Sequence, residues 1–274
     1  MPARFLLGPA GSGKTFRCLA EIRAALRAAP AGQPLILLAP KQATFQLERQ
    51  LLADDSLDGY TRLHIFSFER LARFVLEKLN IPPPDFLSDE GRVMTLRALL
   101  MRHENELKLF SLSARRPGFA RELGILLNEL QQHQWTPARL RAFTRRADLH
   151  RELQDKLHDL ALLFESYTNW LGEHALQDAN RLLDAATDKL HDESKIQNPK
   201  FKIESLWLDG FAEMTPQELD LLAAVAPHCE HATLAFCLDE SPAKENSWLS
   251  IWNAVGKTFQ QCRQRIESLP DGKI

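Results

Sequence analysis

The stretch that decides the fold is Phe5-Leu6-Leu7-Gly8-Pro9-Ala10-Gly11-Ser12-Gly13-Lys14-Thr15, an apolar run followed by a glycine-rich turn. Its second part has the spacing G-x-x-x-x-G-K-T and leads into a helical pattern, which is the setting of a phosphate-binding P-loop. Glycines let backbone N–H groups approach a phosphate closely, and the start of the helix adds its positive dipole end. The opening residues therefore predict a site for a nucleoside triphosphate.

Each position of the turn has an expected part in that site. Lys14 can reach the β- and γ-phosphate oxygens, and the Thr15 hydroxyl can bind Mg²⁺. The expected cofactors are thus ATP and Mg²⁺. The residues predicted to bind the nucleotide are Gly8, Pro9, Ala10, Gly11, Ser12, Gly13, Lys14 and Thr15.

The composition is that of an ordinary globular protein. The 274 residues are 45% hydrophobic and 26% charged, and the net charge of −2 does not by itself indicate a nucleic-acid partner. None of the four cysteines (Cys18, Cys229, Cys237 and Cys262) lies in a C-x-x-C pair, so we expect reduced thiols and no metal site among them. With neither a signal peptide nor a long apolar run, we expect a cytoplasmic protein without a membrane span.

The pattern along the chain predicts an α/β fold. Apolar strands at 4–7, 35–39 and 62–66 alternate with helices at 15–28, 41–52 and 68–79, which favours a parallel sheet covered on both faces. The same pattern returns with strands at 205–208 and 231–237 and helices at 215–225 and 248–266. We interpret residues 1–84 and 201–274 as two parts of one RecA-like P-loop lobe.

Between these parts, residues 85–200 predict an all-helical insertion. No convincing strand is found from Ser88 to about His191, and apolar residues recur at helical spacing. We expect these stripes to form the core of a subdomain rather than a partner surface. The clearest stripe is Leu153, Leu157, Leu160, Phe164, Tyr167 and Leu171.

Asp209 is the expected second half of the nucleotide site. It ends the apolar strand at 205–208, where P-loop enzymes place the acid that holds Mg²⁺. Gly210 follows, where an active motor would carry a glutamate, and Glu213 is the nearest substitute. Asp209 and Glu213 are thus the candidate catalytic residues. Asp-Gly is also a common turn pair, so a purely structural role for Asp209 stays open. A missing general base costs about 10²–10⁴ in rate, so we expect ATP binding with very slow hydrolysis.

Several stretches together resemble superfamily 1 helicases of the UvrD/RecB type, and more closely the B subunit of the AddAB helicase–nuclease. They are Leu38–Thr44, Ile65–Leu71, Lys156–Leu160 and the string Asp209-Gly210-Phe211…Thr215-Pro216-Gln217-Glu218. The helical insertion would then correspond to the 1B subdomain. The stretch Leu238-Asp239-Glu240-Ser241 lacks the glutamine that couples nucleotide to DNA in such helicases, which again puts motor activity in doubt.

This resemblance implies the amino-terminal part of a subunit that works in recombinational repair of double-strand DNA breaks. The implied partners are an A subunit, which is the motor, and single- and double-stranded DNA ends. A second RecA-like lobe and a nuclease domain with an iron–sulfur cluster are implied for other parts of such a subunit. Two rival interpretations remain, namely a stand-alone small-molecule kinase and a structural scaffold with a relic P-loop.

The helicase comparison also implies residues near a single strand. They are Lys41, Gln42, Thr44, Ser67 and Phe68. Polar groups would meet phosphates and an aromatic ring could stack on a base. We expect one of Phe66 and Phe68 to be core by alternation, and Lys41 could equally be a solvated surface lysine.

A second DNA candidate is an arginine-rich stretch of the insertion, which could equally form solvated helix faces. Residues 115–151 hold eight arginines against three acids. The arginines are Arg115, Arg116, Arg121, Arg139, Arg141, Arg145, Arg146 and Arg151.

Overall fold

The computed structural model describes residues 3–53, 57, 59–82, 85–145, 149–193, 202–239 and 250–269. The chain divides into two compact units. The first joins Met1–Pro82 to Leu183–Ile274, and the second is Pro83–Leu182. No helix within these described ranges is long and apolar enough to cross a membrane.

The first unit is built on a five-stranded sheet in the order β1-β7-β6-β2-β3, and every neighbouring pair in it is parallel. The strands are β1 (Ala3–Gly8), β2 (Leu35–Leu38), β3 (Leu63–Phe66), β6 (Ile203–Leu208) and β7 (Cys229–Cys237). The two strands from the carboxyl-terminal part of the chain, β7 and β6, lie between β1 and β2, which confirms the predicted α/β fold with a split parallel sheet. All carboxyl ends of the strands meet at one edge, where the P-loop follows β1.

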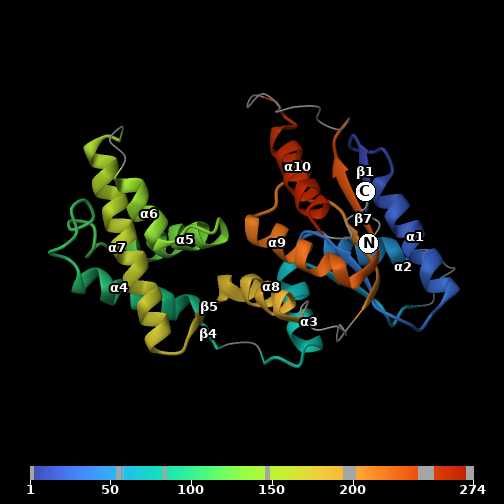
Figure 1. Ribbon diagram of the computed structural model, residues 1–274, viewed down its shortest axis with the longest axis horizontal. Coiled ribbons are helices and arrows are strands. Elements are labelled where there is room, and N and C mark those ends of the chain that lie inside the picture. Colours follow the sequence, from blue (N-terminus) through green and yellow to red (C-terminus); the bar gives the residue numbers. More distant parts are fainter. Residues whose placement is uncertain are drawn as a thin grey trace. The chain divides into compact units, whose positions relative to one another are not determined.

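Helices cover both faces of this sheet (Figure 1). On one face, α1 (Lys14–Ala28) and α2 (Thr44–Leu52) share a core with β2, β3 and inward residues such as Trp207 and Ala235. The other face carries α3 (Phe68–Lys78), α9 (Pro216–Val225) and α10 (Asn253–Glu267). There, the Phe259 ring of α10 packs edge-on against Phe5 and Phe236, with centroids 5.3 and 5.6 Å away.

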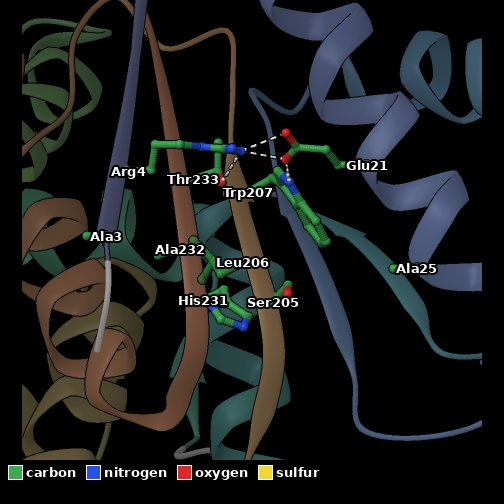
Figure 2. A pocket seen from close by; sticks show the side chains of 10 residues that line it. All are labelled: Ala3, Arg4, Glu21, Ala25, Ser205, Leu206, Trp207, His231, Ala232 and Thr233. Carbon is green, nitrogen blue, oxygen red and sulfur yellow. Dashed lines mark hydrogen bonds and ion pairs between the residues drawn. The ribbon is translucent and has the colours of Figure 1, made fainter. Parts of the chain in front are cut away.

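A polar network joins α1 to strands β1, β6 and β7 and lines a cavity of about 390 Å³ (Figure 2). Arg4 donates to both Glu21 carboxylate oxygens at 2.7 and 2.6 Å and to the Thr233 hydroxyl at 3.0 Å. The Trp207 indole N–H donates to Glu21 at 3.1 Å. Burial alone would raise the pKa of Glu21, but these hydrogen bonds and that from Arg17 bring it below its ordinary value. The charged carboxylate therefore links α1 to β1 and β6, and Arg4 extends the network to β7.

The second unit is mainly helical and has its own hydrophobic core. Its helices are α4 (Asp89–Arg102), α5 (Phe119–Gln132), α6 (Pro137–Thr144), α7 (Arg151–Glu173) and the short 3₁₀ helix η1 (Ala179–Arg181). Of the predicted stripe, Leu160, Phe164, Tyr167 and Leu171 are buried in this core. Leu153 lies at the exposed start of α7. The stripes are thus the core of a subdomain, as predicted.

Two predictions about this insertion were wrong. It is not all-helical, because β4 (Phe86–Leu87) pairs in parallel with β5 (Gln177–Asp178). Strands of two residues leave no periodicity in a sequence. Asp178 of β5 accepts hydrogen bonds from Arg92 and Tyr167, which ties this strand to α4 and α7. The insertion also ends near Leu182 rather than 200, because α8 (Leu182–Glu193) packs with the first unit.

Within the Lys156–Leu160 stretch, Asp159 has a structural role. Its side chain is fully buried on α7 and accepts the backbone N–H groups of Lys108, Leu109 and Phe110 at 2.9, 2.8 and 2.8 Å. Three charge-assisted hydrogen bonds from consecutive amides fix the irregular segment between α4 and α5. The motif therefore holds a loop of the second unit in place.

Candidate nucleotide-binding site

The P-loop turn is closed tightly on itself. The Ser12 N–H donates to the Pro9 carbonyl at 3.2 Å, and the Lys14 ammonium donates to the carbonyls of Gly8 and Pro9 at 2.7 and 2.8 Å. A Cβ at Gly8 would lie 2.4 Å from the Ser12 hydroxyl oxygen, so a side chain there would force the Ser12 hydroxyl to move. Lys14 thus lies over the turn, where its charge faces the loop that would receive phosphate.

Thr15 and Asp209 meet at the edge of the sheet. The Thr15 hydroxyl, in the first turn of α1, donates to the Asp209 carboxylate at 2.5 Å across 194 positions of sequence. Asp209 directly follows β6, and its N–H donates to the Leu38 carbonyl at 3.0 Å, which extends the pairing with β2 by one residue. Only 7% of Asp209 is exposed. The fold therefore brings together the two residues predicted to share one metal ion.

Gly210 has a backbone that an ordinary side chain resists. Its φ of +85° lies in the left-handed region, and a Cβ there would lie 3.3 Å from Pro40 Cδ. Glu213, the predicted substitute, is exposed in the segment between β6 and α9. Asp209 is thus buried beside Thr15, whereas Glu213 is exposed to solvent.

One thiol close enough to Asp209 to be influenced by its charge is unreactive. Cys18 lies on α1 and is almost fully buried. Burial, and secondarily the charge of Asp209, raises the pKa of the Cys18 thiol to about 12. It is therefore a neutral core residue at physiological pH rather than a nucleophile.

The string Thr215-Pro216-Gln217-Glu218 anchors the segment that follows Asp209. Thr215 and Glu218 form a capping box at the start of α9. Burial raises the pKa of Glu218, and hydrogen bonds from Thr215 oppose that rise. The buried Gln217 amide donates to the Asp184 carboxylate of α8 at 3.0 Å, a tie that the sequence does not indicate. Both ends of the segment are thereby fixed.

The predicted DNA-contacting residues follow β2 and β3 at the same edge of the sheet. Lys41 and Gln42 are exposed, whereas Thr44 is half-buried and its hydroxyl donates to the Lys41 carbonyl at 3.0 Å. Ser67 is 9% exposed. Phe68 is 3% exposed and packs edge-on against Phe211 at 5.2 Å.

We expected one of Phe66 and Phe68 to be in the core and the other to be open to DNA. That prediction was wrong, because both rings are buried. Phe66 ends a strand and Phe68 begins a helix, so simple alternation does not apply between them. Phe66 is 9% exposed and packs against Phe74.

The arginine-rich stretch is divided among several local contacts. Arg115 pairs with Glu104 at 2.8 Å, Arg141 pairs with Glu165, and the Arg139 guanidinium lies 4.4 Å from the Trp135 ring centroid. Arg146 lies outside the described residues. Salt bridges on an exposed surface are weak, so these pairs leave the prediction of phosphate binding untested.

Comparison with known proteins decides the family. Residues 5–269 match the family described as "ADDB, N-terminal". The chain belongs to this AddB amino-terminal family. The match covers both units, including the helical one.

Relatives of this AddB-family chain are named as the B subunit of an ATP-dependent helicase/deoxyribonuclease. That of Heliobacterium modesticaldum is 39% identical over 248 residues, covering 89% of this chain and 20% of the relative. That of Symbiobacterium thermophilum is 38% identical over 272 residues, covering 95% of this chain and 23% of the relative. That of Bacillus subtilis is 32% identical over 276 residues (98% and 23%). The chain thus spans about a fifth of the length of these relatives.

Proposed function

We propose that this chain is the ATP-binding, helicase-like segment of a helicase/deoxyribonuclease subunit in DNA repair by recombination. It binds ATP and Mg²⁺ at the P-loop, binds single-stranded DNA at the neighbouring edge of the sheet, and hydrolyses ATP very slowly. The observation that carries this proposal is the contact between Thr15 and Asp209. An A subunit and DNA ends are the partners that we propose for the longer protein.

The donor set at this edge fits a magnesium ion. Hydroxyl and carboxylate oxygens are the ligands that Mg²⁺ prefers, and Thr15 and Asp209 present one of each side by side. When bound, the ion would neutralise phosphate charge. The chain itself would hold the phosphates with the turn at residues 8–13 and with Lys14, after Lys14 leaves the Gly8 and Pro9 carbonyls.

Slow hydrolysis follows from Gly210. A positioned base that activates water is worth about 10²–10⁴ in rate. The Asp209 carboxylate accepts the hydrogen bond of the Thr15 hydroxyl, and Glu213 is exposed to solvent, so neither is positioned as a base for water. The site therefore supports binding much better than turnover.

Equilibrium titration with a fluorescent ATP analogue tests this proposal. We expect saturable binding that strengthens when Mg²⁺ is added, and loss of binding in Lys14→Ala. Asp209→Asn should retain Mg²⁺-free binding but lose the strengthening by Mg²⁺. Steady-state turnover should stay far below one per second. Binding that is absent, or equal in wild type and Lys14→Ala, would refute the proposal.

One observation favours the alternative of a scaffold with a relic P-loop. Lys14 already satisfies its ammonium group within the loop through Gly8, Pro9 and Ser12. If Lys14→Ala lowers the melting temperature while the wild type binds no nucleotide, the loop is structural. If ATP raises the melting temperature of wild type but not of Lys14→Ala, the loop is a binding site.

A further inference from the structure

The aromatic residue that the helicase comparison implies for base stacking is buried in this fold. Phe68 is 3% exposed and closed off by Phe211, and Phe66 is 9% exposed and packed in the same region of the sheet. A base stacks on the open face of a ring, which neither of these side chains presents. If the edge of the sheet binds a single strand, another residue has to supply the stacking surface.

Phe45 presents such a surface. It lies in the first turn of α2, directly after Thr44, and 69% of it is exposed. Burying a phenylalanine ring stabilises a folded protein, and this side chain forgoes that stabilisation in the isolated chain. A single exposed apolar residue is common on protein surfaces, so its neighbours decide whether it has a role.

The neighbours of Phe45 are polar, charged and held firmly. Lys41 and Gln42 are exposed just before it, at the carboxyl end of β2. The turn that carries them is braced by the Ala43 N–H, which donates to the Pro40 carbonyl at 2.8 Å, and by the Thr44 hydroxyl on the Lys41 carbonyl. An exposed ammonium, an exposed amide and an open aromatic ring thus lie within five residues of chain, next to a turn with two internal hydrogen bonds.

This combination suits one kind of ligand. A phosphate group pairs with a lysine, and a flat base stacks on an aromatic ring without regard to its identity. A protein partner would need a contiguous apolar patch, whereas the residues one helical turn from Phe45 on α2, Glu48 and Arg49, are charged and exposed. In the chain, Phe45 also follows shortly after β2, and β2 pairs with β6, the strand that Asp209 follows.

We propose that Phe45 is a base-stacking residue for single-stranded DNA, with Lys41 contacting an adjacent phosphate. This inference rests on the proposed DNA binding and specifies how it is achieved. The strand then crosses the edge of the sheet over the start of α2, and binding is tolerant of sequence because every base offers a flat face.

Fluorescence anisotropy with two labelled oligonucleotides tests the proposal, one of thymidines and one abasic strand of the same length. Phe45→Ala should weaken binding of the thymidine strand roughly 5- to 150-fold and leave the abasic strand unchanged. Phe45→Trp should restore binding, because indole stacks at least as well. Lys41→Ala should weaken both strands and reduce the dependence on salt.

The matched control is Leu52→Ala, which removes an exposed apolar side chain (44% exposed) from the other end of the same helix. It should change neither affinity, and thermal melting should show that all variants remain folded. If wild type binds both strands equally, or Phe45→Ala weakens both alike, stacking by Phe45 is refuted while DNA binding stands. If wild type binds neither strand, DNA binding itself is refuted, and the inference with it.

Discussion

Replacing Gly210 by glutamate restores the residue type found there in active helicases, yet we expect it not to create an ATPase. The φ of Gly210 is +85°, and a residue with a Cβ in the left-handed region costs about 1–2 kcal/mol. The new Cβ would also lie 3.3 Å from Pro40 Cδ, so the proline ring has to shift by a few tenths of an ångström. We therefore expect Gly210→Glu to unfold about 1–2 kcal/mol more easily than wild type.

Relief of this strain would disturb the site itself. Rotating the backbone at Gly210 moves its neighbour Asp209, whose N–H is bonded to the Leu38 carbonyl and whose carboxylate meets Thr15. A strained glutamate is thus a poorly positioned base. The increase in turnover should stay well below the factor of about 10²–10⁴ that a positioned base supplies.

Urea unfolding and a sensitive steady-state ATPase assay measure the two effects on the same protein samples. Gly210→Ala is the matched control, since it has the same backbone strain without a carboxylate. Gly210→Asn should be less destabilised, because asparagine tolerates this conformation better. The reasoning fails if Gly210→Glu is as stable as wild type, or if it hydrolyses ATP a hundredfold faster.

Two further predictions concern stability. Asp159→Ala removes the acceptor of three backbone N–H groups, so urea unfolding should show a loss of about 3 kcal/mol or more, and Asp159→Asn a smaller one; an unchanged midpoint in Asp159→Ala would contradict this. The raised pKa of Glu218 means that the folded state binds the carboxyl proton more tightly than the unfolded state does. The protonated Glu218 therefore contributes to the free energy of unfolding below pH 4.5, and this contribution is lost as pH rises through the pKa of the folded state. Glu218→Gln keeps the capping box, so its stability relative to wild type should increase from pH 4.5 towards neutral; a difference that does not vary with pH would count against the burial of this carboxyl.

Local chemistry could be predicted well from the sequence. The P-loop depends on glycine and lysine at set spacings. Serine and threonine favour helix N-caps, and Ser88, Thr136 and Thr215 each accept the backbone N–H of the residue three positions on. Those interactions lie within a few residues along the chain. The distant pairing of Thr15 with Asp209 could also be anticipated, because the carboxyl ends of parallel strands share one edge of a sheet.

Other features have no local signature. The short β4–β5 pair, the placement of α8 with the first unit and the buried tie from Gln217 to Asp184 depend on partners far along the chain. The same holds for Phe68, whose sequence neighbourhood suggests a DNA contact but whose ring is buried on Phe211.

The sequence by itself determined that this chain carries a glycine-rich turn of P-loop spacing on a parallel α/β sheet and that it resembles one helicase–nuclease family. Tertiary structure alone decided which aromatic ring stays in solvent, where the helical unit ends and why position 210 resists a side chain. The physical reason is that turns, caps and hydrophobic periodicity are set by neighbours in sequence. Burial and backbone conformation at the site are set by whichever distant segments pack there.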